Sequence, residues 1–329
     1  MRKEKSKENM IEKKKTGKRI GITGILAILI LLIIIFLVVK LAIWNSGNVV
    51  LEEVEEGSFD YENLDIVFNV DEKYLEGRYE DGIERVLIIG DQVTTAKVDG
   101  LSIVDILREN ENMPVTTLTC ENASVVDVNN AYLTNDVTPW QAMNLFDTVK
   151  ALCTKDYSLQ EEALNEGLTI SEEYPKFVSQ LKCVDLEEYD TVLIFYSSVD
   201  YIKLSNLYNP EDDYDTSTYE GALRASVKTL QASYPHLRIV LCSPYLHNVL
   251  TNEGEVKSAA LLNYGNGNLS EYVMREYNLA MECCISFMDN YFGLITETNI
   301  DEYATWNYIN KDAVMLIGNH VKEYMLREY

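Results

Sequence analysis

The sequence has few histidines and no cysteines at metal-binding spacing. Only three of the 329 residues are histidine: His236, His247 and His320. The six cysteines form no Cys-x-x-Cys motif and have no histidine at ligand spacing, so we expect no metal site and no cofactor. Most of the cysteines lie in apolar surroundings and are expected to be small core residues, while one disulfide remains open.

Basic residues are scarce beyond the N-terminus. From Asn45 onward the chain has 18 Lys or Arg against 50 Asp or Glu, a net charge of −32. Because phosphate binding needs the opposite sign, this balance argues against nucleic acid as a partner. The 47% hydrophobic content excludes collagenous and wholly disordered classes. A surface this acidic is typical of a soluble secreted domain, and the alternative is attraction of cations or of a basic partner.

One long apolar run stands near the N-terminus. Residues 20–43 are apolar except for Thr23 and Lys40, and a helix of this length crosses the hydrocarbon core of a bilayer. No clear cleavage site follows, which favours an uncleaved single-pass anchor. Residues 1–19 carry nine Lys or Arg, so we expect a cytoplasmic N-terminus and an extracellular C-terminal domain. The predicted organisation is a basic tail at 1–19, an anchor at 20–43, an acidic stalk at 44–80 and a domain at 81–329.

Within the domain, short apolar runs alternate with amphipathic patterns. This alternation predicts βαβ units and a mainly parallel sheet covered on both faces, which is a three-layer α/β/α sandwich. Residues 64–70 alternate like a further strand, at the edge of the sheet. Strands are expected at 86–89, 115–119, 191–195, 239–242 and 285–288, and helices at 98–108, 139–152, 173–181, 219–234, 269–284 and 311–327.

The first of these strands ends in Gly90 and Asp91, and the strand with this ending resembles the first block of the SGNH/GDSL hydrolases. Residues 219–224 and 234–244 resemble a helix and the fourth strand of bacterial members. The resemblance covers residues 81–329 and implies an SGNH-hydrolase-like, flavodoxin-like fold. In this family a serine follows the Gly-Asp pair and attacks an acyl group. Here that position is Gln92, and a carboxamide has no hydroxyl or thiol to activate.

The other positions that the resemblance marks as chemical are also substituted. Val199 stands where the family has an asparagine that helps to stabilise an oxyanion. Thr305 and Tyr308 replace the aspartate and histidine of the last block, and a tyrosine is a poor base at neutral pH. The second block lacks its glycine, although Ala123 or Ser124 could still present a backbone N–H.

Further candidates surround these positions. The expected pocket residues are Asp91, Ala123, Ser198, Asp200, His247 and Trp306. Asp200 is expected to hold a turn. His247 is the one histidine at the rim where strands end, and an ordinary exposed loop histidine is the competing interpretation. A carboxylate-rich rim for a cation is the alternative for the acidic loops, which are otherwise simply solvated.

These residues predict a membrane-anchored extracytoplasmic protein of the SGNH/GDSL type with a substituted triad. We expect it to bind or scaffold without catalysis, with a cell-surface glycan or envelope proteins as candidate partners. The alternative is an esterase, deacylase or acyltransferase that acts on acylated cell-surface glycans through non-standard residues. A serine or cysteine beside His247 would favour the alternative.

Overall fold

The computed structural model describes residues 63–76, 78, 81–126, 142–166, 172–251, 253–305 and 308–327. The chain divides into two compact units, Met1–Phe59 and Asp60–Tyr329, and all described residues belong to the second. The predicted tail and anchor at 1–43 therefore lie outside the described residues. Among the residues that are described, no helix is long and apolar enough to cross a membrane.

A five-stranded parallel sheet forms the centre of the second unit. The strands pair in the order β2-β1-β3-β4-β7. All five predicted strands are confirmed to within one residue. β1 and β3 are buried along their whole length, as strands inside a covered parallel sheet are, whereas β2 at the end of the strand order is only partly buried. The strands are β1 (Val86–Gly90), β2 (Val115–Thr119), β3 (Thr191–Phe195), β4 (Arg238–Cys242) and β7 (Ser286–Met288).

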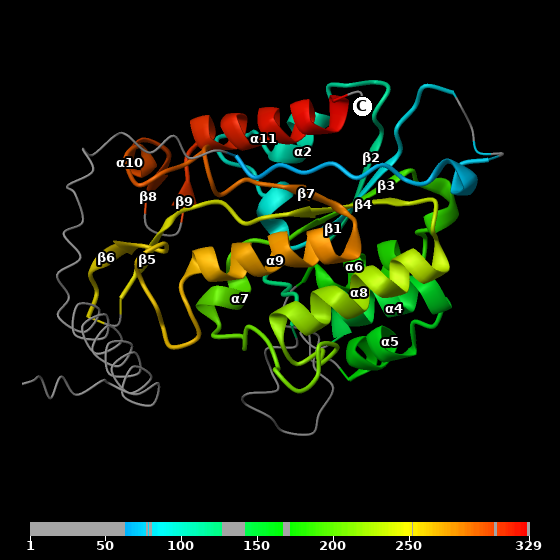
Figure 1. Cartoon of the computed structure of the whole chain (residues 1–329), viewed down its shortest axis with the longest axis horizontal. Helices are drawn as coiled ribbons and strands as arrows, with labels where there is room; N and C mark the ends of the chain where they lie inside the picture. Colours follow the sequence, from blue (N-terminus) through cyan, green and yellow to red (C-terminus); the bar gives the residue numbers. More distant parts are fainter. Residues whose placement is uncertain are drawn as a thin grey trace, which may run out of the picture. The chain divides into compact units, whose positions relative to one another are not determined.

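Helices cover both faces of this sheet, as expected for a three-layer α/β/α fold (Figure 1). α11 packs with α2 on one side, and α8 packs with α4 and α9 on the other. The helix starts follow side-chain caps, for example Thr218 before α8 and Asn310 before α11. The helices are α2 (Ile103–Leu107), α4 (Leu145–Thr154), α5 (Ser158–Asn165), α6 (Tyr174–Leu181), α8 (Tyr219–Ser233), α9 (Leu269–Cys283) and α11 (Lys311–Leu326).

The strand order places a topological switch point between β1 and β3. The chain leaves β1 toward β2 on one side and returns to β3 on the other, so the connections diverge there. Open α/β sheets of this order bind ligands in the crevice outside the carboxyl ends of the strands at that point. The segments that follow β1 and β3 are η3 (Gln92–Thr94) and α7 (Val199–Ile202).

A segment ahead of β1 pairs with β7, the last strand in the sheet order, as expected from the alternation at 64–70. Ile66 forms an antiparallel bridge with Phe287 of β7, with two backbone hydrogen bonds of 2.8 and 2.9 Å. Asp65 binds His320 at 3.1 Å and Arg327 at 3.0 Å through the same carboxylate oxygen. This N-terminal segment is therefore tied to both β7 and the last helix.

All six cysteines are free, so the structure has no disulfide among them, and Cys120, Cys242 and Cys283 are buried.

The remaining elements are short. Two hairpins lie outside the main sheet, one of them between β4 and α9 and the other just before α11. These elements are η2 (Glu72–Tyr74), η5 (Leu186–Glu188), β5 (Asn248–Leu250), β6 (Val256–Ser258), α10 (Ile300–Tyr303), β8 (Ala304–Thr305) and β9 (Tyr308–Ile309).

Candidate functional site

Gly90 and Asp91 bring the ends of β1 and β3 together. A Cβ atom on Gly90 would lie 1.9 Å from the carbonyl oxygen of Phe195, so only glycine permits this approach. Asp91 is fully buried and its side chain accepts the N–H of Val93 at 2.9 Å, which caps η3. Its other oxygen accepts both the N–H and the hydroxyl of Ser197. The carboxylate thus joins the turn after β1 to the turn after β3.

Gln92 occupies the first position of η3, directly after this carboxylate. Its Oε1 atom accepts the backbone N–H of Asn122 at 2.6 Å, and Asn122 lies in the turn after β2 with a positive φ of 58°. The side-chain nitrogen of Gln92 has no hydrogen-bond partner within the described part of the chain. Together Asp91, Gln92 and Asn122 form what we call the β1 wall of the site.

Asp200 holds the turn after β2 against the turn after β3. Its two carboxylate oxygens accept the N–H groups of Val125 at 2.8 Å and Val126 at 3.1 Å, and one of them also accepts the hydroxyl of Ser205. The carboxylate is buried and touches no open space. This geometry is that of a residue that fixes the backbone, as the sequence suggested.

The turns after β3 and β4 bring a serine and a histidine into contact. Ser198 Oγ lies 2.5 Å from His247 Nε2, and the two residues are only 6% and 7% exposed. The other ring nitrogen of His247, Nδ1, lies 2.9 Å from the backbone carbonyl oxygen of Asn248. His247 is therefore not the exposed loop residue that we considered the ordinary interpretation, because its ring packs into the rim. We call Ser198, His247 and Asn248 the β3–β4 wall.

Both walls face one cavity, which we call the rim cavity. It has a volume of about 530 Å³, within the usual range for small-molecule sites. Gln92 and Asn122 line it from the β1 wall, and Ser198 and His247 line it from the β3–β4 wall. The polar groups share the cavity with aliphatic side chains from η3, the turn after η3, α7, β9 and α11: Val93, Val98, Val199, Ile202, Ile309 and Val314.

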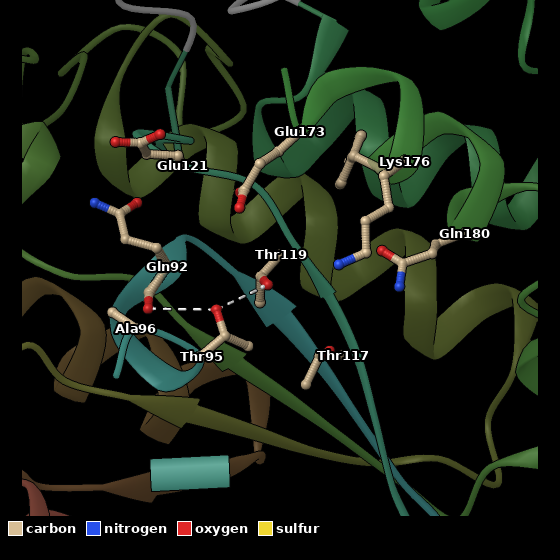
Figure 2. A pocket seen from close by; sticks show the side chains of 10 residues that line it. Gln92, Thr95, Ala96, Thr117, Thr119, Glu121, Glu173, Lys176 and Gln180 are labelled. Carbon is tan, nitrogen blue, oxygen red and sulfur yellow. Dashed lines mark hydrogen bonds between the residues drawn. The ribbon is translucent and has the colours of Figure 1, made fainter. Parts of the chain in front are cut away.

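A second, more polar hollow of about 370 Å³ adjoins the rim cavity (Figure 2). The two share Gln92, Ala96 and Glu121. Figure 2 shows Gln92 and Glu121 on one side of this hollow, with Lys176 and Gln180 of α6 reaching in from the other side. The remaining lining residues are Thr95, Thr117, Thr119, Glu173 and Phe177. An elongated ligand could extend from the apolar cavity into a surface rich in hydrogen-bonding groups.

Burial shifts the proton affinities of the charged groups around the rim cavity. Burial raises the pKa of Asp91 to about 6 and that of Asp200 to about 6, against the hydrogen bonds that each carboxylate accepts. Burial also lowers the pKa of Lys203 to about 8, although both carboxylates act in the opposite direction. The pKa of His247 is lowered by burial, partly offset by its bond to Asn248. The histidine is therefore neutral at neutral pH.

The other candidate residues are placed as follows. Ala123 is buried and its N–H donates to the Cys120 carbonyl, so it is Glu121 and Asn122 of this turn that line the cavity. Val199 lines the cavity with an apolar side chain. The backbones of Thr305 and Tyr308 pair in the β8–β9 hairpin, but their side chains and Trp306 lie outside the described residues. The sequence reasoning missed Asn122 and Lys203 as cavity-lining residues.

Comparison with solved structures gives 25 matching chains, and those described here are 11–14% identical to this chain. One crystal structure is 11% identical with a TM-score of 0.50, covering 74% of this chain and 96% of its own. A protein from Lactobacillus plantarum is 14% identical over 74% of this chain and 96% of its own, with a TM-score of 0.47. The lipase/acylhydrolase from Enterococcus faecalis is 12% identical over 74% of this chain and 95% of its own, with a TM-score of 0.42.

Other matching structures are described as GDSL-like lipases, including proteins from Bacteroides ovatus and Bacteroides uniformis. No protein-family model and no curated protein sequence matches the chain. At these identities the likeness concerns the fold alone. The parallel sheet of order β2-β1-β3-β4-β7 with helices on both faces has the three-layer α/β/α architecture that the sequence resemblance implied.

Proposed function

We propose that this protein is a membrane-anchored extracytoplasmic protein that binds an acyl-bearing molecule of the cell envelope in the rim cavity, and that the family's reaction does not occur at Gln92. The observation that carries the proposal is the bond from the Asn122 N–H to Gln92 Oε1 at 2.6 Å. At the position where the family carries its nucleophile, this chain has a carboxamide oxygen that accepts a backbone donor of the neighbouring turn.

The bond occupies a donor that the family's chemistry would need. Acyl transfer depends on N–H groups that are aimed at the oxygen on which negative charge develops. In the turn after β2 of this chain, the Asn122 N–H donates to Gln92 Oε1 and the Ala123 N–H donates to the Cys120 carbonyl oxygen, so both groups already have internal acceptors. Val199 supplies no second donor from its side chain, because valine has none. Loss of the nucleophile and of its oxyanion donors together supports binding rather than turnover at the β1 wall.

The shape and lining of the site support the ligand class. The rim cavity offers a patch of valine and isoleucine side chains suited to an acyl chain, and the adjoining polar hollow offers threonine, glutamine and carboxylate groups suited to hydroxyls. Phe177 adds an aromatic face of the kind that packs on sugar rings. The extracytoplasmic location rests on the apolar run at 20–43 and the basic tail before it.

Binding of a short alkyl glycoside by the full-length protein in lipid nanodiscs tests this proposal. Hexyl glucoside carries an apolar chain and a sugar but no ester, so it reports binding without chemistry. We expect saturable calorimetric titration by the unmodified protein and none by Ala96→Phe, because Ala96 is exposed at the junction of the two hollows and a phenyl ring would fill it.

Met281→Phe is the matched control, since Met281 is an exposed residue of α9 outside both hollows. This variant should bind like the unmodified protein. Absence of saturable binding to the unmodified protein, or equal binding by Ala96→Phe, would overturn the proposed ligand and site.

A further inference from the structure

The contact between Ser198 and His247 has the geometry of an activated nucleophile. The Oγ–Nε2 distance of 2.5 Å is within hydrogen-bond reach, and the two residues come from separate strand ends that meet at the rim. Both line the rim cavity, so the hydroxyl is next to the space that a ligand would occupy. Neither residue stands at a position where the family resemblance places its triad.

The second bond of the histidine decides which nitrogen carries the proton. A backbone carbonyl can only accept, so the contact of 2.9 Å with the Asn248 oxygen requires a proton on Nδ1. Because burial keeps the ring neutral, Nε2 is then an unprotonated acceptor that faces the Ser198 hydroxyl. The peptide carbonyl of Asn248 orients the ring, as a carboxylate does in a Ser-His-Asp triad.

We propose that Ser198 is a nucleophile for carboxylic esters, with His247 as its general base and the Asn248 carbonyl as the group that orients the base. The inference rests on the proposed function, because it assigns chemistry to the same cavity and takes the bound acyl group as the substrate. It adds a reaction that is independent of the substituted position at Gln92.

The reaction proceeds in two balanced steps. In the first, Ser198 Oγ forms a bond to the acyl carbon while its proton passes to His247 Nε2, and the same proton is then given to the leaving alkoxide as the ester bond breaks. In the second, water attacks the acyl-serine, its proton passes through His247 to the departing Ser198 oxygen, and a carboxylic acid is released. The Nε2 amide of Gln92, which lines the same cavity, is the hydrogen-bond donor that the opposite wall contributes.

A fluorophosphonate probe and p-nitrophenyl butyrate together test this inference on the full-length protein. The probe forms a phosphorus–oxygen bond to an activated serine with loss of fluoride. We expect one equivalent of label on Ser198, located by peptide mass spectrometry, and hydrolysis of the butyrate ester. Ser198→Ala should lose both, and His247→Gln should lower turnover and the labelling rate by about 10²- to 10⁴-fold.

Two matched controls keep the result specific. Ser179→Ala changes an exposed serine of α6, and His236→Gln changes a histidine that lies before β4, at the opposite end of that strand from His247. Both should keep turnover and labelling. Label on another residue, no label on the unmodified protein, or equal turnover by Ser198→Ala would overturn the inference.

The outcomes also separate this inference from the proposed function. If hexyl glucoside binds equally to the unmodified protein and to Ser198→Ala while neither is labelled at residue 198, the nucleophile is refuted and the binding site stands. If Ser198 is labelled but hexyl glucoside does not bind, the nucleophile stands and the ligand class is wrong.

Discussion

Both walls of the rim cavity are formed by residues that follow the carboxyl ends of strands, but their polar groups differ in what they bind. On the β1 wall a strand end presents Gln92, whose carbonyl oxygen accepts the Asn122 N–H inside the protein. On the β3–β4 wall two strand ends present Ser198 and His247, whose hydrogen bond leaves a nucleophilic oxygen at the cavity. The first wall is closed by an internal hydrogen bond, whereas the second has the proton-acceptor arrangement that acyl chemistry needs.

The difference shows that reactivity at such a rim is a property of the assembled strand ends and not of one motif. A parallel sheet gathers the ends of β1, β3 and β4 at one edge, so each end can supply a polar group. Glutamine after β1 offers no nucleophile at that strand end and leaves the other strand ends unaffected. The following variants test whether the walls are as separate as this comparison holds.

Gly90→Ala should break both walls at once. The new methyl group would meet the Phe195 carbonyl at 1.9 Å, and the pairing of β1 with β3 would have to open. We expect the free energy of unfolding to fall by about 3 kcal/mol or more. Denaturant unfolding should show a much smaller effect for Gly318→Ala, where the new methyl meets the flexible end of the Ile106 side chain instead of backbone.

Asp200→Asn should loosen the β1 wall through the turn after β2. Asp200 accepts two N–H groups, and an asparagine would turn its NH₂ toward one of them, which costs about 1–3 kcal/mol. The difference in unfolding free energy between the unmodified protein and Asp200→Asn also depends on pH. The pKa of Asp200 is raised by burial to about 6, so the folded state keeps a proton that the unfolded state releases near pH 4.

Stability of the unmodified protein therefore falls as pH rises from about 4 to 6, by up to about 3 kcal/mol from this group. Asparagine does not titrate, so the stability gap between the two proteins should be widest near pH 4 and narrower at pH 7. Urea unfolding at four pH values measures the gap. A gap that widens toward pH 7 would show that the carboxylate is stabilised, not penalised, by its surroundings.

Gln92→Ala should affect the β1 wall alone. Removing the carboxamide deprives the half-buried Asn122 N–H of its acceptor, for a loss of about 0.5–1.5 kcal/mol in unfolding free energy. If the walls are independent, the hydrogen bond between Ser198 and His247 persists, and the imidazole proton of His247 should keep its NMR chemical shift. A large change in that shift would show that the two walls are coupled.

Gln92→Ser should have the smallest effect of all, giving no ester turnover above that of the unmodified protein. A serine there would meet neither the histidine nor the asparagine of the family pattern, and triad members act as a unit. The comparison variant restores four positions together: Gln92→Ser, Val199→Asn, Thr305→Asp and Tyr308→His. Kinetics should be measured with Ser198→Ala in both backgrounds, so that only turnover from residue 92 is counted. Turnover by the single variant would mean that the β1 wall needs only a hydroxyl.

The sheet could be predicted from the sequence because its signals are local. Runs such as 86–89 and 191–195 are short, aliphatic and bounded by polar residues, and this pattern is enough to predict a buried strand. The two hairpins, β5–β6 and β8–β9, were not anticipated, since their strands are two or three residues long and carry no alternating pattern.

The residues of the site could be predicted from motifs and strand ends, but their contacts could not. Gln92 and Val199 were located through the resemblance, and the structure places both at the rim cavity. The pairing of Ser198 with His247 joins residues 49 positions apart, on either side of the β3–α8–β4 crossover, and no local pattern reports such a contact. The position of His247 just after a strand did indicate the rim, but its burial depended on neighbours from other elements.

The bridge between Ile66 and Phe287 has a practical consequence for self-association. β7 has only three residues, and without the bridge its outer backbone groups would form an exposed sheet edge that can recruit other chains. A shortened protein that starts at residue 81 would lack this cover together with the Asp65 contacts to α11. We expect such a fragment to aggregate, whereas one that starts at Asp60 keeps the edge protected.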